Sequence, residues 1–325
     1  MANLPAEINN PQKINFSLLA TSVVKVIRPV HWVKNLAIFA ALFLTGDFGN
    51  TVLFAKVFWA FVAFNFAASA TYIINDILDA KFDRLHPIKK NRPIASGKLP
   101  VSVAVVIAVI FSLTALYLAL NLNYLFFLLL SSYLLLQLAY SFGLKNLAVV
   151  DILIIATGFI IRVYSGAFVI DAHLSVWFLL CVISVALFLA SGKRRAELNI
   201  ISETQGITRK SLSRYQRELL NSYVTMFGNA AWMSWALYTF FESPKAVLPV
   251  WLFLAELSRA TTINKLLMIT IPVVIFGIMR YEALIFEDRS EAPEKVLLTD
   301  NGLIIAALLW SGLVYLILYS GISAI

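Results

Sequence analysis

The sequence predicts an all-α integral membrane protein with about nine transmembrane helices in a single bundle. Apolar residues make up 60% of the 325 residues, charged residues make up 14%, and the mean hydropathy is +0.83. An ordinary globular chain is about 45–50% apolar and about 25% charged. A core of this size cannot hold so much apolar surface, so the remainder must face lipid. The composition therefore excludes an ordinary soluble domain.

The hydropathy pattern places the expected spans, each of which needs roughly 20 mostly apolar residues. The clear segments are 57–75, 101–120, 124–142, 148–168, 174–192, 219–241 and 302–323, and two shorter ones are 34–50 and 263–281. Residues 99–144 contain no charge, and their only break is Asn121-Leu122-Asn123, which predicts a tight helical hairpin. The segment 246–255 is too short to cross and is expected to be interfacial or re-entrant.

Basic residues assign the two sides of the membrane. The chain has 26 Lys and Arg against 18 Asp and Glu, and the basic residues gather before the first span and after the second, fourth and sixth spans. The intervening loops at 47–50, 121–123 and 171–173 contain no Lys or Arg. Under the positive-inside rule, the amino terminus and the basic loops lie in the cytoplasm and the carboxyl terminus lies outside. The loop at 242–262 fits this orientation least well.

This orientation predicts the domain organisation of a protein integral to the cell (inner or plasma) membrane. A cytoplasmic amino-terminal segment is expected at 1–27, followed by one transmembrane domain at 28–325. Cytoplasmic catalytic loops are expected at 76–98 and 192–218. The net charge is +8, but the basic residues lie between apolar spans. They therefore indicate charged loops at the membrane surface, and no nucleic-acid binding is expected. The single cysteine, Cys181, excludes an intramolecular disulfide and a cysteine metal cluster.

The most informative stretch, Asn75-Asp76-Ile-Leu-Asp79-Ala-Lys-Phe-Asp83, follows the second span. At about 100° per residue, its Asn and three Asp side chains share one helical face. Carboxylates this close repel each other unless a cation lies between them, and Mg²⁺ commonly bridges one or two carboxylates to substrate phosphates. We therefore predict a Mg²⁺–diphosphate site held by Asp76, Asp79 and Asp83. The alternative is a solvated helix end neutralised by neighbouring basic residues.

A basic loop follows the acidic stretch directly, with the sequence His86-Pro-Ile-Lys-Lys-Asn-Arg-Pro-Ile-Ala-Ser-Gly97. Its two prolines end the helix and stiffen the loop, so Lys89 and Arg92 can be held facing the acidic helix. Arginine offers a planar fork to phosphate, and lysine offers a compact charge. The alternative is a loop that only sets the membrane orientation.

These motifs resemble the UbiA superfamily of intramembrane prenyltransferases, which carries N-D-x-x-D-x-x-x-D followed by a basic R-P-x-A-S-G loop. More narrowly, R-P-V-H-W-V-K-N at 28–35, the block at 83–97 and G-K-R-R-A-E-L at 192–198 resemble the decaprenyl-phosphate phosphoribosyltransferase subgroup. The similar blocks run in order from about residue 25 to 300. The resemblance implies a UbiA-like bundle around a central cavity that opens to the cytoplasm.

Two charges lie inside the fifth span, where they are costly and usually face a partner or a polar cavity. Asp151 and Arg162 share a helical face, but their eleven-residue separation is too long for a direct bridge at about 1.5 Å rise per residue. Each is therefore expected to meet another group. For Asp151 this is a metal or a lysine, and for Arg162 it is a phosphate or a carboxylate on another span.

The block after the sixth span departs from the superfamily pattern. Members usually carry a second aspartate-rich motif there, whereas this chain has basic residues and one glutamate, which suits a heavily phosphorylated, water-soluble donor. Other candidates lie at the same expected cytoplasmic level. The full predicted set of substrate-binding residues is Lys34, Asn75, Tyr140, Lys145, Asp151, Arg162, Lys193, Arg194, Glu197 and Arg280.

The resemblance and these charges together predict Mg²⁺-dependent transfer of 5-phosphoribose from phosphoribosyl diphosphate to a polyprenyl phosphate. The expected catalytic residues are Asp76, Asp79, Asp83, Lys89 and Arg92. Two alternatives remain at this point: a prenyltransferase that moves an allylic polyprenyl group to an aromatic acceptor, and a transporter that uses Asp151 and Arg162. The basic block at 192–198 counts against the first, and the gathering of charges at one membrane surface counts against the second. So apolar a surface is also compatible with a homo-oligomer.

Overall fold

The computed structural model describes residues 16–85, 89–203, 215–242, 261–287, 296 and 299–319. Every regular element in these ranges is helical, as predicted. Eight segments of the described chain are long and apolar enough to cross a membrane: Ala20–Leu44, Thr51–Asp83, Val101–Leu122, Tyr124–Phe142, Val150–Val169, Val176–Leu198, Lys265–Phe286 and Asn301–Tyr319. The expectation of an all-α integral membrane protein is therefore confirmed.

The count of nine spans stays a prediction. The segment predicted at 219–241 is a helix, α8 (Arg217–Phe241), and its 25 residues are long enough to cross. Its sequence is more polar, and it is not among the eight apolar segments. The predicted interfacial piece at 246–255 lies outside the described residues, as do parts of the basic loops at 86–88 and 204–214.

The first span differs most from its prediction, which began near residue 34. It consists of α1 (Phe16–Ile27), η1 (Pro29–Phe39) and α2 (Ala40–Leu44), so it already begins inside the segment expected to precede the membrane. The break falls at Arg28, which is left-handed with φ 56° and ψ 62°. Proline disfavours the α conformation in the preceding residue, so the helix is interrupted there. Arg28, which was expected to precede the first span, therefore lies within it.

The second span, α3 (Thr51–Asp83), is much longer than predicted. Its 33 residues extend about 50 Å at about 1.5 Å per residue, whereas a bilayer core is about 30 Å thick. The Asn50 side chain caps its start by accepting from the backbone N–H groups of Val52 and Leu53, and its sequence contains no Gly or Pro. The acidic stretch therefore lies on the end of a continuous helix, which corrects the expected loop boundary at residue 76.

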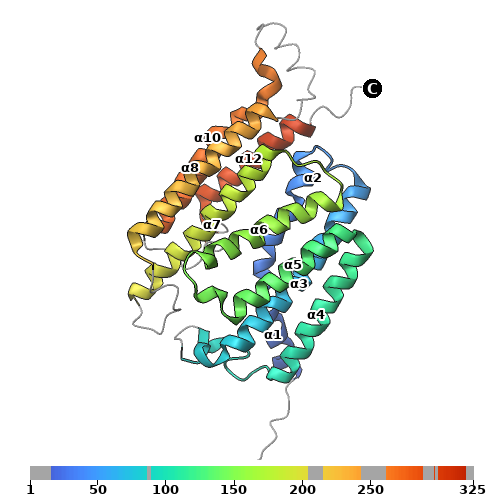
Figure 1. Cartoon of the computed structure of the whole chain (residues 1–325), viewed down its shortest axis with the longest axis vertical. Helices are drawn as coiled ribbons and strands as arrows, with labels where there is room; N and C mark the ends of the chain where they lie inside the picture. The colour runs from blue at the N-terminus through green and yellow to red at the C-terminus, as the bar shows by residue number, and fades with distance from the viewer. Residues whose placement is uncertain are drawn as a thin grey trace, which may run out of the picture.

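The remaining helices form one bundle (Figure 1). They are α4 (Val101–Leu122), α5 (Tyr124–Phe142), α6 (Val150–Val169), α7 (Val176–Glu203), α8, α10 (Ile271–Phe286) and α12 (Asn301–Tyr319), with 3₁₀ turns η2 (Lys89–Asn91), η3 (Leu144–Asn146) and η5 (Thr261–Thr270). The predicted hairpin is confirmed, because Asn123 alone separates α4 from α5. Helices α3, α4 and α5 lie on one side, α8, α10 and α12 lie on the other, and α6 and α7 lie between them. The predicted loop at 192–218 begins as part of α7.

Helix α6 and η1 are in close contact, and this contact depends on a glycine. A Cβ atom added at Gly166 would overlap the backbone carbonyl oxygen of Ile38. Because the backbone itself is in the way, no side-chain rotation relieves this overlap. The contact therefore fixes the depth of η1 against α6.

We expect Gly166→Ala to lower the free energy of unfolding by about 1–3 kcal/mol, the usual cost of overpacking a core. Thermal unfolding in detergent measures this loss. The matched control is Gly277→Ala, also in a helix, where an added Cβ meets no atom within 4 Å. The control should be neutral or gain up to about 1 kcal/mol from helix propensity. Equal stability of the two variants would contradict the close contact.

Candidate active site

A cavity of about 580 Å³ lies between η1, η2 and helices α3, α5, α6 and α7. The predicted site residues that line it are Lys34, Asn75, Lys89, Arg92, Tyr140, Arg162, Lys193 and Glu197. They come from six elements spread over most of the chain. The central cavity expected from the sequence is therefore present, and its opening toward the cytoplasm stays a prediction.

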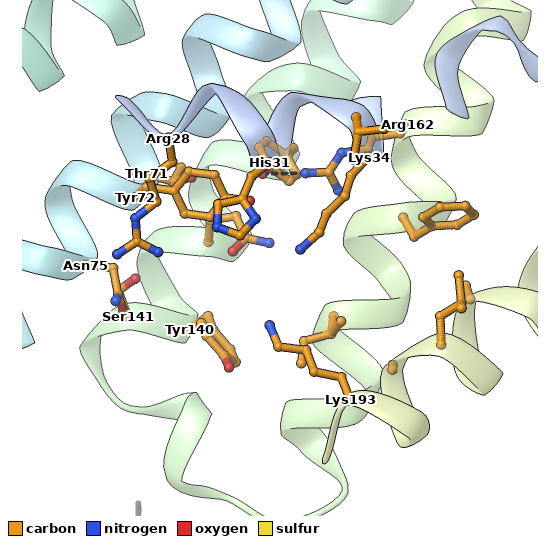
Figure 2. A pocket seen from close by; sticks show the side chains of 18 of the residues that line it. Arg28, His31, Lys34, Thr71, Tyr72, Asn75, Tyr140, Ser141, Arg162 and Lys193 are labelled. Carbon is orange, nitrogen blue, oxygen red and sulfur yellow. Dashed lines mark hydrogen bonds between the residues drawn. The ribbon is translucent and has the colours of Figure 1, made fainter. Parts of the chain in front are cut away.

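Cations dominate the cavity wall. Arg28, Lys34, Lys89, Arg92, Arg162 and Lys193 line it, and Glu197 is the lining carboxylate among the described residues. Figure 2 shows Lys34 and Lys193 extending into the cavity from opposite sides. Positive charge concentrated in a partly apolar cavity attracts anions far more strongly than the same charge in water. The cavity is thus suited to a ligand with several negative groups.

The acidic end of α3 borders the cavity and is paired with two arginines. Asp76 accepts on one oxygen, Oδ1, from Arg28 at 2.5 Å and from Arg92 at 3.0 Å. Arg92 also donates to Asp83 at 2.7 Å. The side chains of Asp76 and Asp83 are almost fully buried, at 2% and 6% exposure. Arg92, which follows η2, therefore ties the basic loop to two of the three aspartates.

The third aspartate is paired with a lysine from η3. Lys145 donates to Asp79 at 2.5 Å and to the Asn75 amide oxygen at 3.3 Å. The Asn75 amide nitrogen in turn donates to Asp79 at 3.1 Å. Asn75 and Asp79 are four residues apart, so this bond shows that they share a helical face, as the spacing predicted. Lys145 is buried and does not itself line the cavity.

The acidic side chains fit a hard divalent cation in chemistry, since carboxylate and amide oxygens are its preferred protein ligands. In this structure each of the three carboxylates already accepts from a protein cation. Within the described ranges, no three carboxylate, imidazole or thiol side chains are grouped closely enough to hold an ion. Mg²⁺ commonly uses only one or two carboxylates and completes its shell with substrate phosphates and water. Asp76 and Asp79 fit that smaller set.

Asp151 and Arg194 form an ion pair inside the protein. Their side chains are both 0% exposed, and Arg194 Nε lies 2.6 Å from Asp151 Oδ2. Arg194 also donates to Glu197 and to the Tyr140 hydroxyl. The expected metal or lysine partner of Asp151 is therefore wrong, because its partner is an arginine. Neither Asp151 nor Arg194 lines the cavity. Through Arg194, however, the pair holds two residues that do, Glu197 and Tyr140.

Tyr215 completes this network and was not predicted from the sequence. Its hydroxyl donates to Asp151 Oδ1 at 2.7 Å and accepts from the backbone N–H of Val149 at 2.5 Å. Burial, and then the bond to Asp151, raise the pKa of Tyr215, so the hydroxyl stays a donor. Val149 is left-handed, with φ 68°. Nothing in the local sequence marks Tyr215, because its partners lie in a distant part of the chain.

Arg162 has neutral partners only. It donates to Asn35 at 2.6 Å, to the carbonyl oxygen of Gly158 at 2.6 Å and to the Tyr133 hydroxyl at 2.9 Å. Among the described residues it forms no ion pair, so the expected carboxylate partner on another span is not found there. Its 7% exposed side chain faces the cavity. The sequence correctly predicted that Asp151 and Arg162 do not bridge each other.

Arg280 lies away from the cavity lining. It pairs with Asp300 at 2.8 Å, and this bond lowers the pKa of the Asp300 carboxyl. The pair joins the second half of α10 to the residue that precedes α12. The structure therefore gives Arg280 a position between two helices and does not bring it to the other predicted site residues.

Seven polar residues that line the cavity were not predicted as site residues: Arg28, His31, Thr71, Tyr72, Tyr133, Gln137 and Ser141. Arg28 and His31 belong to the block at 28–35, so the sequence carried a signal. Lys34 of this block was predicted as a site residue, whereas Arg28 was expected only to precede the first span. Figure 2 shows Arg28, His31 and Tyr72 on the same side of the cavity.

Comparisons with known proteins agree with this fold. The sequence model of the UbiA prenyltransferase family matches residues 36–263. The decaprenyl-phosphate phosphoribosyltransferase of Corynebacterium glutamicum is 36% identical over 90% of this chain and 85% of its own length. The proteins of the same name from Mycobacterium tuberculosis and Mycolicibacterium smegmatis are each 35% identical, with coverage of 90% and 93% of this chain and 92% and 93% of theirs.

Solved structures share the architecture. A UbiA homolog from Archaeoglobus fulgidus, bound to GPP and Mg²⁺, superimposes with a TM-score of 0.68 over 91% of this chain and 99% of its own. The same homolog bound to Cd²⁺ gives a TM-score of 0.62. Both are 17% identical in sequence, so they bear on the fold alone. The family match, the curated relatives and the helical bundle together show that this chain belongs to the UbiA prenyltransferase family.

Proposed function

We propose that this protein transfers 5-phosphoribose from phosphoribosyl diphosphate to a polyprenyl phosphate and releases diphosphate. One observation carries the proposal: the cavity wall that borders the acidic helix end is lined by six cations and one carboxylate among the described residues. A donor with phosphate at both ends needs several cations, whereas a donor with only a diphosphate needs fewer. The names of the curated relatives support the same reaction.

The acidic end of α3 would hold the metal. Asp76 and Asp79 would supply carboxylates to Mg²⁺, and Asp83 would hold Arg92 in place through its bond of 2.7 Å. When bound, Mg²⁺ neutralises the charge of diphosphate as a leaving group. Neighbouring Asn75 would position Asp79, to which it donates in this structure. The Archaeoglobus homolog has been solved with Mg²⁺ and with Cd²⁺, which supports the use of a divalent ion.

The cations would bind and position the phosphates. Lys89 and Arg92 lie beside the acidic helix end and would hold the diphosphate. Lys34 and Lys193 face each other across the cavity (Figure 2) and would hold the 5-phosphate or the lipid phosphate. Fixed positive groups in such a site stabilise negative charge as it develops on the leaving group. Tyr140 and Glu197 line the remaining wall.

The bond changes follow from the substrates. An oxygen of the polyprenyl phosphate forms a bond to the anomeric carbon of the ribose, while the bond from that carbon to the diphosphate oxygen breaks. The electron pair leaves with diphosphate. The acceptor phosphate is already ionised near neutral pH, so no side chain must remove a proton. The protein therefore catalyses the transfer by positioning the two substrates and by stabilising the charge that develops.

We further propose that the site faces the cytoplasm. Exposed basic residues lie at the end of the bundle where α3 ends and α4 begins, namely Lys81, Arg84, Lys90 and Lys98. The described turns at the opposite end, 45–50 and 170–175, contain none. Under the positive-inside rule, this difference favours a cavity on the cytoplasmic side. The domain boundaries 1–27 and 28–325, and self-association, stay predictions.

A transfer assay tests the function. Purified protein in detergent would receive phosphoribosyl diphosphate labelled in the ribose, polyprenyl phosphate and Mg²⁺, and we expect label in the lipid phase. Chelation of Mg²⁺ should remove this signal. The matched reaction supplies an allylic polyprenyl diphosphate and an aromatic acceptor. Turnover there, with no labelled lipid from the first reaction, would replace our proposal with a prenyltransferase.

A further inference from the structure

We propose that Arg28 is an exchangeable counter-ion: it neutralises Asp76 in the free protein and moves to the donor diphosphate when the metal–diphosphate complex binds. This inference rests on the proposed function and adds a residue and an order of events to it. Its consequence is that metal and diphosphate bind together and that the metal alone binds weakly. Arg28 was not among the residues predicted to form the site.

Each carboxylate of the acidic helix end is already paired with a protein cation before any ligand arrives. Its three carboxylates form ion pairs with three protein cations: Arg28 and Arg92 with Asp76, Arg92 with Asp83, and Lys145 with Asp79. A bare divalent ion would add two uncompensated positive charges to this partly desolvated site. A divalent ion bound to diphosphate brings net negative charge, which protein cations can accept. Electrostatics therefore favours joint binding.

The pairing of Asp76 shows which cation can leave. Its single oxygen Oδ1 accepts from both Arg28, at 2.5 Å, and Arg92, at 3.0 Å. Arg92 also holds Asp83, so it is tied at two points, whereas Arg28 has Asp76 as its only carboxylate partner among the described residues. Loss of Arg28 frees a lone pair for a metal and still leaves Asp76 paired. Because Arg92 still neutralises Asp76, the free-energy cost of moving Arg28 away is small.

The position of Arg28 allows it to reach a ligand. Its side chain is 21% exposed and lines the cavity, in contrast to the 0% exposed Arg194. Its guanidinium lies 5.3 Å from the ring centre of Tyr72, which also lines the cavity. Figure 2 shows Arg28 beside Tyr72 and close to Asn75. The face of the Tyr72 ring can stabilise the Arg28 cation both when it pairs with Asp76 and when it pairs with the diphosphate.

The backbone at Arg28 fixes where this side chain starts. Residue 28 is left-handed and precedes Pro29, at the break between α1 and η1. In a continuous helix, the 3.6-residue repeat would fix the direction of the Arg28 side chain. The break changes that direction, and the side chain reaches Asp76 on α3. The break in the first span therefore has a role in the site, which a straight transmembrane helix would not provide.

Equilibrium dialysis of the purified protein tests the inference with Mn²⁺ and pyrophosphate as probes, without turnover. For the wild type we expect pyrophosphate to raise the affinity for Mn²⁺ at least about tenfold, and Mn²⁺ to raise the affinity for pyrophosphate by the same factor. Arg28→Gln should bind Mn²⁺ alone more tightly and show a coupling reduced by about threefold or more. Arg28→Lys keeps the charge and should retain most of the coupling.

The matched control is Arg84→Gln, which removes the same charge from the same region. Arg84 is exposed, its Nε donates to the backbone carbonyl of Ala95, and it forms no ion pair with an aspartate in the described part of the chain. Its coupling should equal that of the wild type. Equal Mn²⁺ affinity of the wild type with and without pyrophosphate would overturn the exchange. Unchanged coupling in a folded Arg28→Gln protein would overturn the role of Arg28. Either result leaves the transfer assay free to support the proposed function.

Discussion

Asp79→Asn is expected to reduce phosphoribosyl transfer by about 10²–10³-fold or more, the scale on which a single charge-stabilising group acts in an enzyme site. The substitution removes one of the two carboxylates proposed to hold Mg²⁺. It keeps the shape of the side chain, and the amide oxygen can still accept from Lys145, which donates to Asp79 at 2.5 Å. Activity should fall while the fold persists. Labelled-lipid formation measures the activity and thermal unfolding measures the stability. Both are measured on the same preparation, so a loss of activity can be distinguished from a loss of the fold.

The control for this experiment is Asp171→Asn, the same chemical change at the far end of the bundle. Asp171 is exposed and left-handed, with φ 52°, a conformation that asparagine tolerates. We expect it to leave activity and stability unchanged. Wild-type activity in Asp79→Asn would rule out Asp79 as a metal ligand. Loss of activity in both variants would point to a general charge effect.

Asp151→Leu is expected to destabilise the protein by about 3–5 kcal/mol, because it leaves the arginine of a fully buried ion pair without its partner. Arg194 and Asp151 are both 0% exposed, with 2.6 Å between their charged atoms. The Tyr215 hydroxyl would lose its acceptor in the same change. Thermal or denaturant unfolding in detergent measures the loss. Replacing both partners, as Asp151→Leu with Arg194→Met, should recover part of it.

An exposed ion pair provides the comparison. Arg280 pairs with Asp300 at 2.8 Å, but the arginine side chain is 41% exposed. Exposed ion pairs add little to stability, so Arg280→Met should unfold at nearly the same temperature as the wild type. If Asp151→Leu unfolds at the same temperature as Arg280→Met, the buried pair has no special contribution to stability.

The helices were largely predictable because their signals are local. The apolar runs and the hairpin at Asn121–Asn123 depend on neighbouring residues, and the structure confirms them. The errors occurred where a local signal was ambiguous. The Arg28–Pro29 break divided the first span, and charged residues on long helix ends, as in α3, resembled loops.

The acidic motif was also readable, because a one-face spacing of like charges is a local property. The residues that pair with it in the folded protein could not be identified from the sequence. Arg28 meets Asp76 across 48 residues, Lys145 meets Asp79 across 66, and Arg162 meets Asn35 across 127. Similar basic residues occur throughout the chain, and sequence alone cannot rank which of them reaches a given carboxylate.

The sequence by itself determined that the chain is a helical membrane protein, that it has an acidic motif beside a basic loop, and that these resemble one family. Only the tertiary structure decided that Arg194 is buried with Asp151, that Arg162 has neutral partners and that Arg28 reaches the site. Helix periodicity and hydropathy act over a few residues, so sequence contains them directly. Ion-pair partners depend on how separate helices pack, which is a property of the whole bundle.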